Sequence, residues 1–162
     1  MEKKEKFISV INEHKKIIFK ICSSYCRHFD ERKDLEQEIL LQLWHSFPKY
    51  DGRVKISTWM YKIALYTAIS FYRDNEKHKR NHVAIDESVI SLPEEQTDQK
   101  ENIHFLYHCI RQLNELDKAL ILLYLEEHSY KEIAQIIGIT ETNVATKLNR
   151  IKNHLKEQFN NQ

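Results

Sequence analysis

The chain has 162 residues, of which 41% are hydrophobic and 30% are charged, so it is long enough for one ordinary domain or two small ones. Only 2 Gly and 2 Pro are present, whereas closed β folds with many tight turns use more of both. We therefore expect an all-α protein. No glycine-rich motif for a dinucleotide or a nucleotide phosphate occurs. The longest apolar run, residues 119–125, is far shorter than the about 20 residues of a membrane span, so no membrane partner is expected.

Charge is distributed unevenly along the chain, although the formal net charge is only +1. Residues 1–80 hold 17 Lys and Arg against 11 Asp and Glu, residues 81–100 hold 1 against 5, and residues 101–162 hold 7 against 8. A basic first half is compatible with contact to a polyanion. Lysine-rich helices that keep their outer faces in water would give the same pattern, and on charge alone we favour that interpretation.

Cysteine usage bears on compartment and on metal binding. An odd count of 3 Cys, with no apolar signal-peptide segment behind the N-terminus, predicts a cytoplasmic protein with reduced thiols. Cys22 and Cys26 lie four residues apart, with His14 and His28 near them in sequence. Because zinc sites usually present four well-spaced ligands, we favour buried thiols instead. We expect no metal, no cofactor and no catalytic residues.

Helical periodicity dominates the first half of the chain. It predicts a first helix over residues 7–25 and a second that begins at or just before Asp34 and stops at Pro48. A third helix, which Ser57 or Thr58 would cap, is expected over residues 59–80.

The second half begins with a change of composition. Residues 81–100 are acidic and hold few large apolar side chains, which favours a flexible linker between two domains, 1–80 and 101–162. Beyond it, helices are predicted over residues 103–113, 116–125, 130–137 and 141–158.

The last two predicted helices have the layout of a helix-turn-helix. Ser129 is placed to cap the first of them, and Glu132 would complete a capping box. Gly138 can take the positive φ that ends this helix, and Thr140 is placed to cap the next one.

The final helix has two distinct faces on a helical wheel. The apolar face, directed at a core, consists of Val144, Leu148, Ile151 and Leu155. Hydroxyls, amides and cations, which suit base edges and phosphates, make up the other face. They are Thr142, Thr146, Asn149 and Asn153, with Lys147 and Arg150 beside them. An ordinary helical hairpin with a polar outer face is the alternative interpretation.

The predicted third helix mixes aromatic rings with cations. Rings that stack on unpaired bases, beside cations that hold phosphates, are typical of single-stranded nucleic-acid binding. However, Trp59, Ile63 and Tyr66 also recur at helical spacing, and such a stripe on its own more often belongs to a protein core than to a stacking surface.

Three motifs together are more specific than any one of them. They are Asp34-x-x-Gln37-Glu38 in a helix that ends in Trp44, residues 56–64 (ISTWMYKIA), and residues 129–134 (SYKEIA). In this order and spacing, the chain resembles the extracytoplasmic-function (ECF) subgroup of the bacterial sigma-70 family over about residues 7–80 and 101–158. The resemblance implies a sigma factor, not an enzyme, which directs RNA polymerase to promoters, melts the minus-10 element and recognises the minus-35 element.

The resemblance also implies residue roles. The contacts to core polymerase would be Asp34, Gln37, Glu38, Leu41 and Trp44. The minus-10 contacts would be Lys55, Ser57, Trp59, Lys62, Tyr66, Ser70 and Arg73. The minus-35 contacts would be Tyr130, Lys131, Thr142, Asn143, Thr146, Lys147, Asn149 and Arg150. The implied partners are the β′ clamp helices and the β flap of core RNA polymerase, promoter DNA and an anti-sigma factor.

The chain departs from the family pattern in both halves. In the final helix, Ala145 stands where a cation is common and Thr142-Asn143 stands where Ser or Gly-Thr is common. In or just before the third helix, Ile56 stands where Phe is usual and Tyr66 stands where Asn is common. We therefore expect unusual base preferences at both promoter elements.

Two other classes of protein are alternatives. One is a free-standing helix-turn-helix regulator whose N-terminal half binds a ligand or dimerises, and the other is a helical scaffold that binds only protein. The helix with Asp34 and Trp44, followed by the basic and aromatic helix, distinguishes a sigma factor from both.

Overall fold

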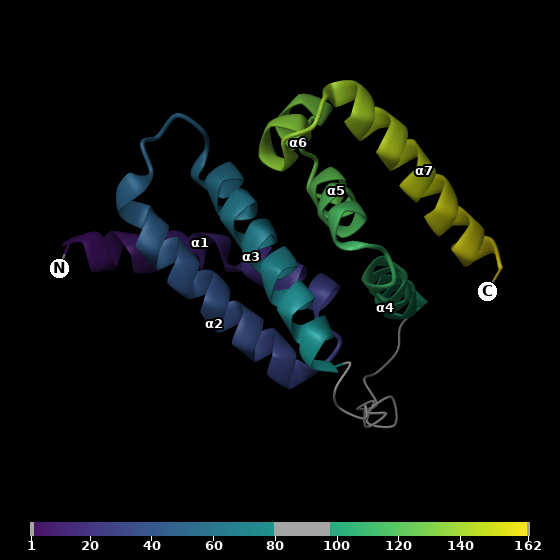
Figure 1. Cartoon of the computed structure of the whole chain (residues 1–162), viewed down its shortest axis with the longest axis horizontal. Coiled ribbons are helices and arrows are strands. Elements are labelled where there is room, and N and C mark those ends of the chain that lie inside the picture. The colour runs from purple at the N-terminus through teal and green to yellow at the C-terminus, as the bar shows by residue number, and fades with distance from the viewer. Residues whose placement is uncertain (1, 80–97, 162) are drawn as a thin grey trace. The chain divides into compact units, whose positions relative to one another are not determined.

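The computed structural model describes residues 2–79 and 98–161, and of residues 74–79, 98 and 99 it describes the backbone only. The described residues form helices and connecting turns, which confirms the predicted all-α class (Figure 1). The elements are α1 (Glu2–Tyr25), α2 (Phe29–Ser46), a 3-10 turn η1 (Phe47–Lys49), α3 (Ile56–Lys79), α4 (Asp98–Arg111), α5 (Glu115–Leu125), α6 (Tyr130–Ile137) and α7 (Glu141–Asn160). The chain divides into two compact units, residues 1–71 and 72–162.

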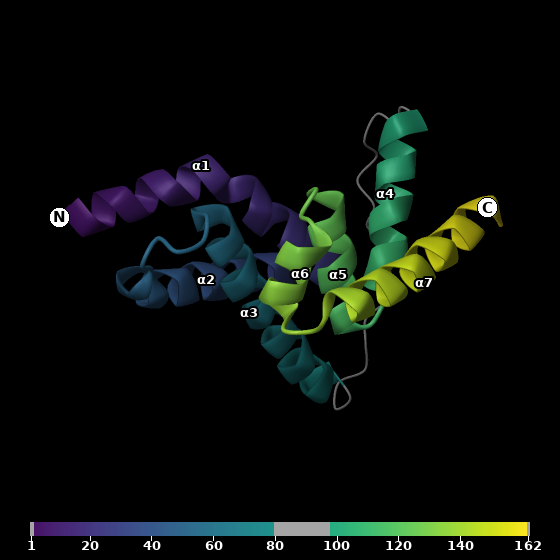
Figure 2. The ribbon, with the colours of Figure 1, turned by 90° about the horizontal axis from the view of Figure 1, so that it is seen from above.

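In the first unit, α1 and α2 run antiparallel. Near the start of α1, the ring of Phe7 meets that of Trp44 near the end of α2, with ring centroids 5.1 Å apart. At the other end, Arg32 Nε donates a hydrogen bond of 3.0 Å to the backbone oxygen of Cys26, just beyond α1. A non-helical residue, His14 (φ −117°, ψ 18°), bends α1, and the bend can be followed in Figure 2.

Buried apolar side chains recur at helical spacing in all three helices of this unit. The core residues of α2 and α3 are Leu35, Ile39, Leu43, Met60, Tyr61, Ala64, Leu65 and Ala68.

Two of the predicted helix starts are wrong. α2 begins at Phe29 rather than near Asp34, and its N-cap, His28, makes no side-chain capping hydrogen bond. α3 begins at Ile56, because the N–H of Trp59 already donates to the carbonyl of Lys55 at 3.1 Å. Ser57 and Thr58 therefore lie inside the first turn of α3 and do not cap it.

In the second unit, α5 is buried on most sides, as its apolar sequence predicts, and residues 117–123 are all buried. Asn114 caps it by accepting a hydrogen bond of 2.8 Å from the N–H of Asp117. α6 spans the predicted residues 130–137, and α4 begins at Asp98, so residues 98–100 of the expected linker are helical. Residues 80–97 of the chain, which hold the rest of that linker, lie outside the described residues.

Every helix in the described ranges is too short or too polar to cross a membrane.

Candidate nucleic-acid and protein interfaces

Capping hydrogen bonds define where α6 begins and ends and where α7 begins. Ser129 Oγ accepts a hydrogen bond of 3.1 Å from the N–H of Glu132, and Thr140 Oγ1 accepts one of 3.1 Å from the N–H of Asn143. Gly138 has a φ of 82°, and its N–H donates to the carbonyl of Ala134 at 2.8 Å. These three predictions are confirmed, and the short turn between the two helices is visible in Figure 2.

The side chain of Glu132, the second member of the predicted capping box, has a partner in the turn before α6. The carboxylate of Glu132 lies 2.9 Å from Nδ1 of His128, whose side chain is only 10% exposed. Glu132 therefore also connects the start of α6 to the turn that precedes it.

The predicted division of α7 into two faces is confirmed. The four apolar residues assigned to the core are all buried, namely Val144, Leu148, Ile151 and Leu155. On the opposite face, the predicted polar residues are exposed except for Lys147, which is half-buried; the exposed ones are Thr142, Thr146, Asn149, Arg150 and Asn153. Asn143, in the first turn, is also exposed. At the start of α6, Lys131 is exposed and Tyr130 is half-buried. The structure thus brings the expected minus-35 residues of α7 onto one surface of the helix-turn-helix.

Arg150 has a partner that the sequence did not reveal. Its Nη2 lies 3.3 Å and 3.2 Å from the two carboxylate oxygens of Asp117, at the start of α5. The Asp117 side chain is 11% exposed, whereas the Arg150 side chain is 63% exposed. The carboxylate is thus nearly buried, and the arginine remains largely in contact with solvent. Arg150 therefore joins α7 to α5 and still presents much of its guanidinium outward.

On α3, the expected minus-10 residues share one exposed face. Lys62, Tyr66, Ser70 and Arg73 follow one another at intervals of four, four and three residues, and all are exposed. This spacing places them on one side of a helix. Lys55, before the helix, is exposed, and Ser57 is half-buried.

The aromatic residues of α3 divide into packed and exposed rings. The ring of Trp59 lies 5.2 Å from that of Tyr50 and 6.2 Å from that of Phe47, so it belongs to an aromatic cluster. Tyr61 is 3% exposed, whereas Tyr66 is 47% exposed. Of the stripe Trp59, Ile63 and Tyr66, the first two are half-buried and Tyr66 is exposed. The core interpretation therefore fits Trp59 and Ile63, and the surface interpretation fits Tyr66.

The loop before α3 is tied to the same cluster. The hydroxyl of Tyr50 donates a hydrogen bond to the carbonyl of Val54. Because the Tyr50 ring also packs on Trp59, this hydrogen bond connects the loop before α3 to the aromatic cluster. The loop leads directly into α3.

On α2, four of the five expected polymerase contacts share a face. Asp34, Gln37 and Leu41 are exposed, and Glu38 is half-buried and accepts a hydrogen bond of 3.1 Å from Nε2 of Gln42. Trp44 is half-buried and instead packs on Phe7 of α1. The face combines a carboxylate pair, an amide and an apolar side chain, which suits contact with another protein.

The cysteine thiols are buried, as expected. Burial raises the pKa of Cys22 to about 12, and the neighbouring Cys26 and Glu36 add to this effect. The Cys22 thiol is therefore protonated at neutral pH and is a poor nucleophile and metal ligand. In the part of the chain that the structure describes, no three His, Cys, Asp or Glu residues are grouped as metal ligands.

The fold and these faces define a helix-turn-helix protein with a separate helical unit that carries exposed polar faces. The family model "Sigma-70 region 2" matches residues 10–78, and the model "Sigma-70, region 4" matches residues 106–155. The chain belongs to the ECF subgroup of the sigma-70 family. It is an RNA polymerase sigma factor that directs promoter-specific initiation and is not itself an enzyme.

Similar proteins come from several bacteria. The ECF sigma factor SigM of Bacillus subtilis is 30% identical over 136 residues, which cover 79% of each chain. The sigma factor YlaC of the same species is 28% identical over 137 residues, covering 82% of this chain and 79% of YlaC. The sigma factor RpoE of Bartonella quintana, solved in complex with the anti-sigma factor NepR, has a TM-score of 0.72 at 18% identity and covers 97% of this chain and 96% of its own. That likeness shows a shared fold.

Proposed function

We propose that this sigma factor uses three separate faces for three contacts: α2 for core polymerase, α3 for the melted minus-10 strand and α7 for the minus-35 duplex. The observation that supports the proposal is that most of the residues expected for each contact share one face of one helix. On α3, all four such residues beyond Trp59 are exposed on the same side.

For core polymerase, the proposed site is the α2 face with Asp34, Gln37, Glu38 and Leu41. Leu41 is 48% exposed, although it is apolar, and the three polar residues lie on the same face in the two turns before it. An apolar anchor within a polar rim is the usual anatomy of a protein interface. We propose the β′ clamp helices as its partner. Trp44 would act by packing on Phe7 and thus holding α2 against α1.

For the minus-10 element, Lys62 and Arg73 would hold phosphates, and the exposed ring of Tyr66 would stack on an unpaired base. Ser70, between the two ends of this face, would add a hydrogen bond. Lys55 and Ser57 lie in the adjoining loop and first turn. The ring of Trp59 already packs on Tyr50 and Phe47. Trp59 would therefore act by supporting the loop before α3, not by stacking on a base.

For the minus-35 element, the N-terminal half of α7 would enter the major groove. Thr142, Asn143, Thr146 and Asn149 offer hydroxyls and amides to base edges, and the cations Lys147 and Arg150 flank them. At the start of α6, Lys131 and Tyr130 would contact phosphates.

The β flap and an anti-sigma factor are the further proposed partners. An apolar groove of about 390 Å³ lies between α5 and the C-terminal half of α7. The polar residues proposed to contact DNA in the first turns of α7 do not line it. Leu125 at its edge is 46% exposed, which makes this groove the candidate site for the flap. Because similar RpoE was solved with the anti-sigma factor NepR, we propose that such a protein also regulates this chain, in the cytoplasm where transcription takes place.

Promoter opening by the reconstituted holoenzyme tests the proposal. Permanganate oxidises unpaired thymines, so it reports melting of the minus-10 element. We expect Tyr66→Ala and Lys62→Ala to reduce thymine reactivity while leaving core polymerase binding unchanged. Wild-type reactivity in both variants would show that the α3 face does not hold the melted strand.

A further inference from the structure

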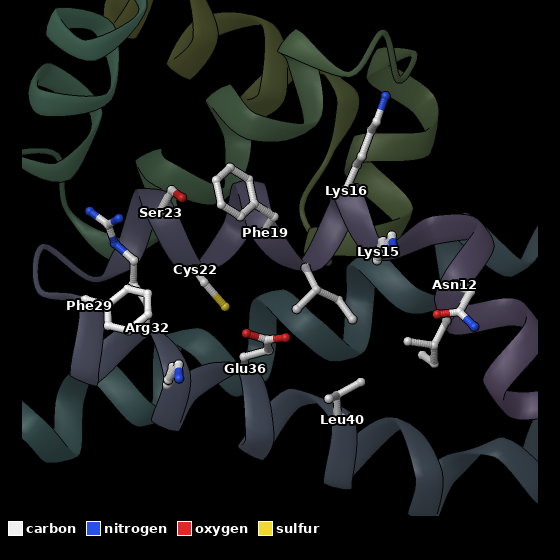
Figure 3. A pocket seen from close by; sticks show the side chains of 13 residues that line it. Asn12, Lys15, Lys16, Phe19, Cys22, Ser23, Phe29, Arg32, Glu36 and Leu40 are labelled. Carbon is white, nitrogen blue, oxygen red and sulfur yellow. The ribbon is translucent and has the colours of Figure 1, made fainter. Parts of the chain in front are cut away.

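A groove of about 650 Å³ runs between α1 and α2 in the first unit (Figure 3). Its volume lies in the range of ligand and peptide sites, about 300–1,000 Å³. The apolar residues that line it are Ile11, Ile18, Phe19, Cys22, Phe29 and Leu40. None of the residues assigned above to polymerase or promoter DNA lines it. The groove is therefore a surface that those contacts leave unused.

The groove combines a buried floor with exposed aromatic edges. Ile18 and Cys22 are each 4% exposed, and Figure 3 shows Cys22 pointing into the space between the two helices. Phe19 of α1 and Phe29 of α2 are 68% and 66% exposed. Two aromatic side chains so exposed beside one apolar groove indicate a protein-binding surface.

Cations line both walls of the groove. Lys15 and Lys16 come from α1, and Arg32 and Lys33 come from α2, whereas Glu36 is the one carboxylate among the lining residues. An apolar floor between two cationic walls is complementary to a ligand that is apolar on one side and acidic on its flanks.

Arg32 is held in place at one end of the groove. Its Nε donates to the carbonyl of Cys26 and its Nη2 to the carbonyl of Arg27, each at 3.0 Å. Lys33 lies beside it on α2, with Nζ 5.0 Å from the centre of the Phe29 ring. This end thus presents a fixed cation, a second cation and an exposed ring together.

The two cation pairs are far apart along the groove. Arg32 contacts Cys26, which follows Lys15 by eleven residues, and α1 and α2 run antiparallel. At a helical rise of 1.5 Å per residue, the pairs are separated by on the order of 15 Å. A single carboxylate cannot meet both pairs, but a helix with carboxylates about three turns apart can.

We propose that the α1–α2 groove binds an amphipathic helix of a partner protein, with an apolar stripe against the floor and Asp or Glu side chains against both cation pairs. Helix-in-groove binding of this kind uses apolar anchors one turn apart and charge on the flanks. The contact is additional to those with polymerase and promoter DNA.

The test uses the full-length chain and a fluorescein-labelled peptide of about 14 residues, long enough to span the groove. The peptide carries Leu along one helical stripe and Glu on both flanks, and a twin with Lys in place of Glu is the control. We expect fluorescence anisotropy to show saturable binding of the acidic peptide and no binding of the basic twin.

Variants in which lysines of the groove are replaced by glutamate test whether the acidic peptide binds there. Lys16→Glu together with Lys33→Glu, on opposite walls, is expected to weaken binding by about tenfold or more. Lys4→Glu together with Lys6→Glu makes the same change in charge on the exposed start of α1, outside the groove, and serves as the matched control. We expect this control to change affinity by less than about twofold.

An apolar substitution tests the floor and edges. Phe29→Ser is expected to weaken binding to a similar extent, whereas Ile8→Ser, which changes an exposed apolar residue outside the groove, is expected to have no effect. Circular dichroism during thermal unfolding checks that each variant is folded.

Several results would overturn the proposal. Equal binding of both peptides, or equal losses in the two charge-reversed variants, would show that overall charge governs binding. Binding of myristate without binding of the acidic peptide would assign the groove to a small amphiphile. Self-association of the chain that Phe29→Ser abolishes would assign it to a second copy, and displacement of the peptide by core polymerase would assign it to the polymerase.

Discussion

The guanidinium of Arg150, on the recognition helix α7, lies 3.2 Å and 3.3 Å from the two carboxylate oxygens of Asp117 at the start of α5. The pair joins residues 33 positions apart in the chain. It links α7, the helix that we propose faces DNA, to the buried helix of the same unit, and it limits the orientations that the Arg150 side chain can take.

We expect this pair to stabilise the second unit modestly. Because the Arg150 side chain is 63% exposed, water and salt screen the interaction, and a coupling free energy on the order of 1 kcal/mol is expected. A double-mutant cycle with Asp117→Ala and Arg150→Ala, measured by urea unfolding, gives this coupling directly. Strictly additive single effects would mean that the pair contributes nothing to stability.

Asp117 should also influence promoter binding through Arg150. Arg150→Ala is expected to weaken binding of holoenzyme to a cognate promoter by about 1–3 kcal/mol if Arg150 contacts a base. Asp117→Asn, which keeps the shape of the side chain, should lower cognate affinity less and leave non-specific affinity unchanged or higher. Wild-type affinity of Arg150→Ala on a cognate promoter would contradict this role.

Asn149 and Lys147 should differ in the kind of contact that they make. Asn149→Ala is expected to cost about 1–3 kcal/mol on cognate DNA and little on other sequences, because an amide reads base edges. Lys147→Ala should weaken binding equally on all sequences. It should also reduce the slope of log affinity against log salt concentration by about one. Titrations of both variants on cognate and scrambled minus-35 DNA at several salt concentrations separate the two outcomes.

Gly138 should be required by its backbone angle rather than by space. Its φ is 82°, and a Cβ at this position would meet nothing within 4 Å. Gly138→Ala is therefore expected to destabilise the second unit by about 1–2 kcal/mol, through backbone strain alone. Gly138→Asn should cost less, since Asn tolerates this conformation better. Equal unfolding midpoints for Gly138→Ala and wild type would contradict the strained-backbone explanation.

Cys22 should make the protein less stable at alkaline pH. Its pKa is about 12 in the folded chain against an ordinary value of 9.0, so between these values the unfolded chain loses a proton that the folded chain retains. The free energy of unfolding then falls as pH rises, by about 2 kcal/mol between pH 8 and pH 10.5. Urea unfolding at both pH values should show a smaller fall for Cys22→Ala than for wild type. An equal fall would exclude Cys22 as the cause.

The sequence was most informative where structure is encoded by neighbouring residues. The start and end of α6 and the start of α7 were predicted correctly because Ser129, Gly138 and Thr140 act within one turn of themselves. The start of α2 was wrong because its N-cap, His28, makes no capping hydrogen bond that a sequence pattern could reveal. The start of α3 was wrong because Ser57 and Thr58, although good caps, follow a helix that has already begun.

Features that depend on distant residues could not be predicted. Nothing in the spacing of Asp117 and Arg150 indicates that α5 and α7 bring them together. The role of Trp59 was left open by its helical spacing, and only the positions of Tyr50 and Phe47 show that its ring is packed. The groove between α1 and α2 likewise requires the antiparallel arrangement of both helices.

The most direct measurement is the affinity of the purified chain for bacterial core RNA polymerase, by fluorescence anisotropy of the labelled sigma factor. Asp34→Ala together with Gln37→Ala changes the proposed face of α2. Glu36→Ala is the matched control, because it removes a carboxylate from the same helix on the side of the groove. We predict tight wild-type binding, a loss of about tenfold or more in the double variant and no change in the control. Unchanged binding of the double variant would contradict the proposed polymerase-binding face.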